Sequence, residues 1–244
     1  MAEPYRDFGE LTVRADKGAD YTISVMDRSS PVTLTAIHAG HIEPLTGELA
    51  AAIAAEDHNM YLLCGLHPGS APRLRVPVTR FDDVRLTALV ERSVVAIAIQ
   101  GVAGEGEVVH LGGANRRLLE HLQSSFEGAG LATAGPAGRI AAHSPARFVN
   151  RAAQGGVQIE LTHALRASLA SVPLGPDGAW QDPAARTERF HTFVQAVRQG
   201  LREYLAAQDA DLEVALARFE EATREIRRVI PLGDNGHGGC VHHS

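Results

Sequence analysis

The chain has 244 residues, of which 45% are hydrophobic and 21% are charged, and its formal net charge is -6. This composition is that of a globular protein with a sizeable core, and the acidic balance argues against a general nucleic-acid binder. Two cysteines give no disulfide framework, which favours a reducing, cytoplasmic location. No signal-peptide pattern and no membrane-length apolar stretch is present, so we expect neither secretion nor membrane contact.

Short runs rich in Val, Leu, Ile and Thr, bounded by glycine, proline or polar residues, predict buried strands. In chain order these are residues 21–25, 31–37, 59–65, 74–78, 93–101, 107–111, 130–133 and 156–161. Pro77 confines the fourth of them to an edge position. Apolar residues at helical spacing predict helices over residues 46–56, 82–92, 114–128, 162–166, 184–207 and 211–229.

Strands that alternate with helices indicate an α/β sandwich around a largely parallel sheet. We expect one α/β domain over residues 1–207, a C-terminal helix over residues 208–230 and a flexible tail over residues 231–244. The tail carries several potential metal ligands, but their spacing fits no closed four-ligand site. These are His237, Cys240, His242 and His243.

Two histidines and a glutamate lie in the short stretch between the predicted strand 31–37 and the helix that follows it. They are His38, His41 and Glu43, and Thr46 is the expected N-cap of the helix. Ligands bind at the carboxyl ends of strands in α/β sheets, and His with a carboxylate is a usual set of protein ligands for catalytic zinc. The alternative is chance, because twelve histidines are spread over the chain.

Four motifs occur in the same order as in the phage poly-γ-glutamate hydrolases. Residues 38–48 resemble their His-Gly-Gly-x-Ile-Glu-Pro-Gly-Thr-Ser-Glu motif, and residues 81–83 resemble their Phe-Asp-Glu element. Residues 109–113 are similar to the Val-x-Val-Gly-Gly element. Residues 150–166 resemble the Asn-Arg…Gly-Val-Gln-Leu-Glu-Leu signature and the arginine that follows it. The resemblance covers about residues 18–170.

This resemblance implies a carboxypeptidase-like three-layer α/β/α sandwich with a mixed sheet. It also implies a zinc-dependent hydrolase of γ-glutamyl amides, in which His38 and Glu43 match the first two zinc ligands. The position of the third ligand, a histidine in the family, holds Gln100, and a second family histidine is replaced by Arg75. An amide oxygen is a poor zinc ligand beside imidazole. His41 is the alternative third ligand.

Within this resemblance, Glu160 is the expected general base, which takes a proton from water and passes it to the leaving amine. The alternative is that Glu160 pairs with Arg151 or Arg166. Arginines grip carboxylates bidentately, so Arg151, Arg166 and Arg75, together with Asn150, are expected to bind a glutamyl substrate. Each arginine has an ordinary surface ion pair as its alternative role.

Two functions of different classes follow. The first is a metal-dependent amidohydrolase or peptidase that uses zinc on a peptide or poly-glutamyl substrate, favoured by His38, Glu43 and Glu160. The second is a degenerate, metal-poor relative that binds a peptide or protein, or that has altered chemistry in a biosynthetic pathway. Gln100 favours the second function, and the helices over residues 184–229 would suit it as an interaction surface.

Overall fold

A seven-stranded mixed sheet forms the centre of the computed structural model, which describes residues 5–69, 73–137 and 143–229. The strand order is β1-β3-β2-β4-β7-β5-β6. β1 pairs antiparallel with β3 and β5 pairs antiparallel with β7, while the other neighbours are parallel. The strands are β1 (Tyr21–Met26), β2 (Val32–Gly40), β3 (Asn59–Gly65), β4 (Val95–Val102), β5 (Val108–Gly113), β6 (Ala132–Ala134) and β7 (Gly156–Thr162).

The central strands are the most apolar ones, as expected for parallel strands covered on both faces. Every residue of β2 and of β7 is buried, and so is nearly all of β3 and β4. The predicted α/β class and the mixed, largely parallel sheet are therefore confirmed. The predicted strand over residues 74–78 is wrong: this segment is irregular, although Leu74 and Val76 are buried.

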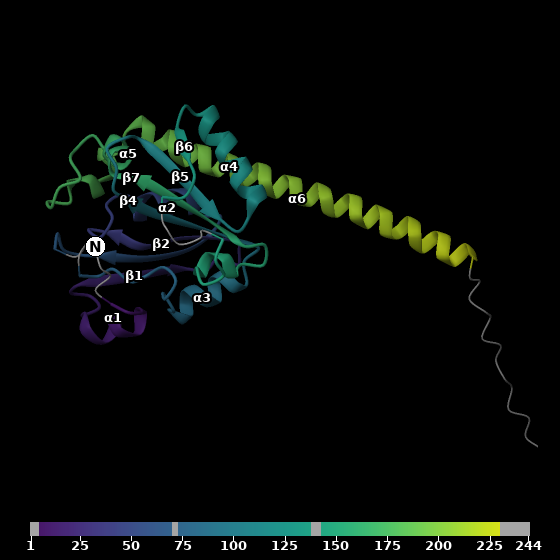
Figure 1. The fold of residues 1–244 in the computed structure, drawn as a ribbon, viewed down its shortest axis with the longest axis horizontal. Helices are drawn as coiled ribbons and strands as arrows, with labels where there is room; N and C mark the ends of the chain where they lie inside the picture. The colour runs from purple at the N-terminus through teal and green to yellow at the C-terminus, as the bar shows by residue number, and fades with distance from the viewer. Residues whose placement is uncertain (1–4, 70–72, 138–142, 230–244) are drawn as a thin grey trace, which may run out of the picture. The chain divides into compact units, whose positions relative to one another are not determined.

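Helices lie on both sides of the sheet (Figure 1). Side chains of α1 and α3 share one core cluster with residues of β3 and β4. On α4 and α6, the ring centroids of Phe126 and Phe193 lie 5.1 Å apart. α1 was not predicted from the polar N-terminal sequence. The helices are α1 (Phe8–Arg14), α2 (Thr46–Ala54), α3 (Val84–Glu91), α4 (Arg116–Gly128), α5 (His163–Ser168) and α6 (Glu188–Val229), and three short 3₁₀ helices are η1 (Phe148–Arg151), η2 (Ala179–Gln181) and η3 (Pro183–Ala185).

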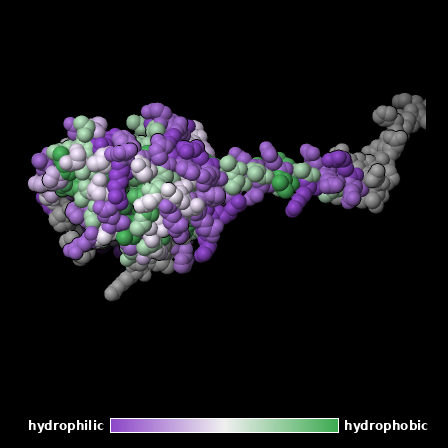
Figure 2. All heavy atoms as spheres, turned by 90° about the horizontal axis from the view of Figure 1, so that it is seen from above, coloured by the Kyte–Doolittle hydropathy of each residue, from purple (hydrophilic) through white to green (hydrophobic). Residues whose placement is uncertain are grey.

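α6 is one helix of 42 residues, so the two separate helices predicted over residues 184–207 and 211–229 are corrected. The residues between them, 208–210, include no glycine or proline that would end a helix. The chain divides into two units, residues 1–202 and residues 203–244. On α6 within the second unit, hydrophobic side chains are exposed among hydrophilic ones (Figure 2): Leu212, Val214, Leu216 and Phe219. Among the described residues, no helix has the length and apolar character needed to cross a membrane.

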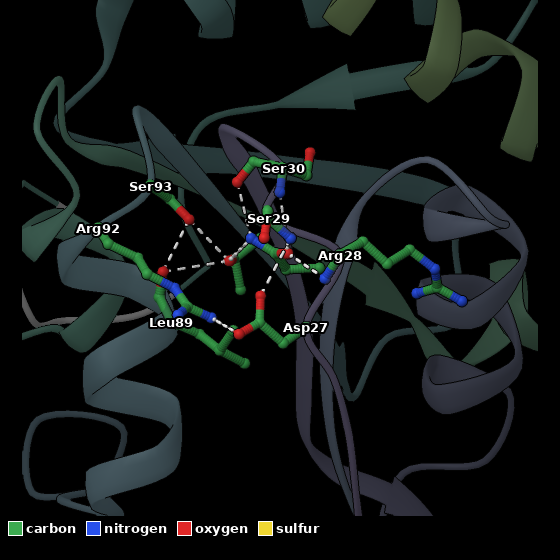
Figure 3. Close-up of polar contacts among 9 residues, drawn as sticks. Asp27, Arg28, Ser29, Ser30, Leu89, Arg92 and Ser93 are labelled. Atoms are coloured by element: carbon green, nitrogen blue, oxygen red, sulfur yellow. Dashed lines mark hydrogen bonds and ion pairs between the residues drawn. The ribbon is translucent and has the colours of Figure 1, made fainter.

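A polar network fixes the amino ends of β2 and β4 (Figure 3). The Ser93 hydroxyl donates a 2.8 Å hydrogen bond to the carbonyl of Leu89 at the end of α3, and lies 2.8 Å from the Thr33 hydroxyl on β2. Arg92 forms an ion pair with Asp27 in the loop before β2. These bonds hold the register of β2 against β4, so the opposite, carboxyl ends of both strands are also set relative to each other.

Candidate active site at the carboxyl ends of β2, β4 and β7

The candidate site lies where three parallel strands end at one edge of the sheet. β2 is parallel to β4, and β4 is parallel to β7, so their carboxyl ends share an edge. The pairing of β2 with β3 changes register between Ala36 and Ala39, which places a bulge at the start of the predicted metal-binding turn. Bulges redirect side chains next to active sites, and the residues within this irregularity are Ile37 and His38.

The turn after β2 is held in an unusual backbone conformation. Leu45 has a φ of 72°, in the left-handed region, and it is the residue that precedes α2. For a residue with a side chain this conformation costs about 1–2 kcal/mol, and such strain often occurs at functional sites. Thr46 is not the N-cap that the sequence predicted; it is the first residue of α2, and its hydroxyl donates to the carbonyl of Glu43 at 2.8 Å.

His38 and Glu43 contact each other inside the protein. Nδ1 of His38 lies 3.4 Å from Oε1 of Glu43, and the two residues are only 5% and 3% exposed. The other ring nitrogen, Nε2, faces the backbone of Val76, with 3.1 Å to its carbonyl oxygen and 3.3 Å to its amide nitrogen. The irregular segment around Val76 is therefore attached to the site through His38.

Arg75, on the same segment, binds the carboxylate of Glu43. Its Nη1 lies 2.9 Å from Oε1, and the backbone N–H of Gly101 donates to Oε2 at 2.7 Å. Burial alone would raise the pKa of Glu43, but His38, Arg75 and the Gly101 N–H together lower it. Glu43 is therefore a buried carboxylate that stays ionised because donors surround both of its oxygens.

Arg166 is a second buried arginine at this edge. It is 6% exposed, and its Nη1 donates a 3.0 Å hydrogen bond to the carbonyl of Pro44. A Cβ at Gly101 would lie 2.8 Å from Cζ of Arg166, so the glycine leaves the room that the guanidinium fills. Nε of Arg166 is buried and has no hydrogen-bond partner in the part of the chain that the structure describes.

Gln100 and Glu160 are neighbours across β4 and β7. Their Cα positions are paired in the parallel register, so both side chains project from the same face of the sheet, and they are 8% and 7% exposed. Oε2 of Glu160 accepts a 3.0 Å hydrogen bond from the N–H of Ala137. Gln100 directly precedes Gly101, whose N–H binds Glu43, so Gln100 lies at the same edge as the His38–Glu43 pair.

Arg147 is a buried residue of this region that the sequence analysis missed. It is 4% exposed, donates to the side-chain oxygen of Gln158 and interacts electrostatically with Glu160. Burial lowers the pKa of its guanidinium, and the charge of Glu160 opposes this shift. Arg147 lies in an irregular segment just before η1, where no periodic pattern signals its burial.

The remaining predicted site residues are exposed or have partners other than His38 and Glu43. Arg151 is exposed on η1. The side chain of Asn150 accepts from the N–H of Ala114 at 3.1 Å and donates to the carbonyl of Ser144 at 2.8 Å. The ring of His41 meets Trp180 edge-on at 5.6 Å between centroids, and burial together with the charge of His67 lowers the pKa of His41.

The donor set does not fit a zinc ion. Among residues 5–69, 73–137 and 143–225, no three His, Cys, Asp or Glu side chains gather as a metal-binding group. Gln100 offers a neutral amide where imidazole would suit zinc. Both carboxylate oxygens of Glu43 are already engaged, Oε1 in an ion pair with Arg75 and Oε2 in a hydrogen bond from the Gly101 N–H. The predicted tail ligands lie outside the described residues.

Comparisons with two solved structures agree with this architecture of a mixed sheet and surrounding helices. A solved bacteriophage poly-γ-glutamate hydrolase has a TM-score of 0.77 and 25% identity, over 84% of this chain and 100% of that chain. A zinc-free structure of YndL has a TM-score of 0.71 and 25% identity, over 82% of this chain and 98% of that chain. The UPF0714 protein YndL of Bacillus subtilis strain 168 is 29% identical over 205 residues, which are 81% of this chain and 77% of that protein.

The model of the poly-γ-glutamate hydrolase family matches residues 5–196. The chain therefore belongs to this family, and the resemblance drawn from its four motifs is confirmed. The match extends beyond the residues 18–170 covered by those motifs and reaches into the first part of α6.

Proposed function

We propose that this chain hydrolyses a glutamyl amide bond in a peptide or poly-glutamyl substrate bound at the carboxyl edge of the sheet. The observation that carries the proposal is the buried carboxylate of Glu160, aligned with Gln100 on the neighbouring strand and at the same edge as the His38–Glu43 pair. Membership of the poly-γ-glutamate hydrolase family supports the reaction class.

Glu160 is the general base in this proposal. As the oxygen of water adds to the amide carbonyl carbon, Glu160 takes a proton from that water and then delivers it to the leaving nitrogen. The carbon–nitrogen bond breaks, and the products are a carboxylic acid and an amine. The N–H of Ala137, 3.0 Å from Oε2, orients the carboxylate for this transfer. No metal takes part in the proposal, because the donors around Glu43 do not fit one.

Arginines supply the charge that a glutamyl substrate needs. Arg75 and Arg166 lie around Glu43, and a planar guanidinium binds a carboxylate through two parallel hydrogen bonds. Arg151 is exposed and would meet a part of the substrate that remains in solvent. Asn150 has no substrate role here, since its amide already bonds Ala114 and Ser144.

A second candidate function is binding of a glutamyl peptide without turnover. Two observations favour it. Glu43, the carboxylate that would otherwise bind a metal, is held by Arg75 and by the Gly101 N–H. Gln100 occupies the expected position of the third metal ligand. In this case Glu160 is a structural partner of Arg147 rather than a base.

Glu160→Gln separates the two functions, because it keeps the shape of the side chain and removes its basicity. If Glu160 is the base, cleavage of γ-glutamyl oligomers falls by about 10² to 10⁴-fold while calorimetric binding of the oligomer persists. Glu56→Gln is the matched control, since its side chain is 95% exposed, and it should keep full activity. Binding without cleavage by the unmodified chain would establish the second function and contradict the first.

A further inference from the structure

Both oxygens of the Glu43 carboxylate are already engaged by donor groups of the protein. Oε1 lies between Nδ1 of His38 at 3.4 Å and Nη1 of Arg75 at 2.9 Å, and Oε2 accepts the Gly101 N–H at 2.7 Å. A metal held by His38 and Glu43 would have to enter next to Nη1, because that nitrogen already binds the oxygen facing His38. A guanidinium is protonated at every physiological pH, so the ion would meet a fixed positive charge.

The charge around Glu43 is already more than compensated. Arg75 and Arg166 both interact electrostatically with the carboxylate, and Arg166 also interacts with Arg75. Two cations therefore surround one anion in a buried place, where charges are screened less than in water. A divalent cation would increase this excess of positive charge, whereas an anion would balance it.

We propose that Arg75 takes, in this chain, the place of a metal ion beside His38 and Glu43, so that this edge of the sheet binds a carboxylate ligand without a metal. The positive charge comes from the protein itself and is fixed to the segment that packs over His38 through Val76. The nature of the ligand rests on the proposed function, since a glutamyl chain supplies the carboxylate.

Arg166 adds a second, buried guanidinium on which an anionic ligand could act. Its side chain is buried, yet Nε has no hydrogen-bond partner among the described residues. A buried N–H without a partner costs free energy, and such groups in native structures call for a physical explanation. A ligand carboxylate that bonds this guanidinium would satisfy the unused donor and would balance the excess charge.

Zinc binding tests whether Arg75 occupies the position of a metal ion, and it needs no measurement of activity. The full chain is prepared with His237, Cys240, His242 and His243 changed to Ala, so that these side chains bind no metal. In this background the parent should retain no stoichiometric zinc after dialysis, as measured by mass spectrometry. Arg75→His combined with Gln100→His should bind one zinc per chain, at least about 10²-fold more tightly than the parent in a chelator competition.

A matched control makes the same kind of change two residues away. Arg73 is exposed, so Arg73→His combined with Gln100→His should bind zinc no better than Gln100→His alone. The inference is overturned if the parent holds one zinc per chain that His38→Ala removes. It is also overturned if the folded Arg75→His/Gln100→His variant gains no zinc affinity, because Arg75 would then not be what excludes the ion.

Ligand binding is measured separately with a γ-glutamyl oligomer in EDTA and in zinc. The parent should bind equally well in both solutions, and Arg75→Lys, which keeps the charge but loses the planar fork, should bind at least about tenfold more weakly. A parent that binds the oligomer only with zinc would contradict the inference. A parent that binds no oligomer in either solution would contradict the proposed function, while the zinc titration would still decide the place of Arg75.

Discussion

At the scale of single residues, the site depends on how closely Gly101 approaches its neighbours. Its N–H binds Glu43, and its missing side chain leaves space for the guanidinium of Arg166. One backbone position therefore connects the carboxylate with the buried arginine. Because protein interiors are packed as densely as organic crystals, even one added methyl group at such a position is felt.

Gly101→Ala is expected to destabilise the protein by about 1–3 kcal/mol, since the new Cβ would lie 2.8 Å from Cζ and 2.9 Å from Nε of Arg166. Urea denaturation measures the loss. Gly128→Ala is the control, because nothing lies within 4 Å of a Cβ there and the residue ends α4. Equal stability of the two variants would show that Arg166 moves aside freely.

At the scale of secondary-structure elements, the N-cap residue of α3, Asp83, makes three interactions. Asp83 caps the helix by accepting from the N–H of Arg85, pairs with the Arg85 side chain at 2.6 Å, and accepts a 2.6 Å hydrogen bond from the hydroxyl of Tyr61 on β3. Burial alone would raise the pKa of Asp83, but Arg85 and Tyr61 together lower it. The charge of Asp83 therefore fastens α3 to the sheet.

The sign of the pH dependence follows from this lowered pKa. The stabilisation by Asp83 is fully present above the unfolded-state pKa of about 3.9 and is lost as the pH falls through the lower folded-state value. Asp83→Asn, which still caps a helix, is expected to cost about 1–2 kcal/mol at pH 7 and progressively less below about pH 4. Urea denaturation across this pH range tests this expectation. If the free energies of unfolding of the parent and the variant differed by the same amount at every pH, the charge of Asp83 would have no role. Asp82→Asn, at an exposed neighbour, should show no such dependence.

The irregular segment around Arg75 determines which group contacts the carboxylate of Glu43. Its apolar pattern suggested an edge strand, but Val76 is bound by the ring of His38 instead of by a neighbouring strand. The buried side chains of Leu74 and Val76 anchor the segment and so deliver Arg75 to Glu43. The proposed exchange of a metal for a guanidinium depends on this packing.

At the scale of the whole molecule, the proposed absence of a metal predicts how stability responds to zinc and chelator. A ligand at one hundred times its dissociation constant stabilises the folded state by about 2.7 kcal/mol, which is about 5–10 °C in melting temperature for a chain of this size. We expect the full chain, with the tail histidines and cysteine replaced, to melt at the same temperature in EDTA and in zinc. A rise of several degrees with zinc that His38→Ala abolishes would contradict the proposal.

The exposed apolar residues of α6 belong to the same scale. Leu212, Leu216 and Phe219 recur at spacings of four and three on the part of α6 beyond residue 202, which is the spacing of one helix face. These side chains are exposed, and a helix face of this kind would suit the interaction surface expected for residues 184–229.

The sequence by itself determined the α/β class, most of the strands and the family. Buried parallel strands must be apolar along their whole length, and four motifs in fixed order identify relatives at low overall identity. It also placed His38, Glu43, Gln100 and Glu160 near the ends of strands, because that prediction needs only local pattern and the parallel direction of the strands.

Only the tertiary structure decided what these residues contact. The pairing of Arg75 with Glu43, the burial of Arg147 and the close approach of Arg166 to Gly101 join residues far apart in the chain through irregular segments. No periodicity encodes such contacts, because they depend on how loops pack over a finished sheet.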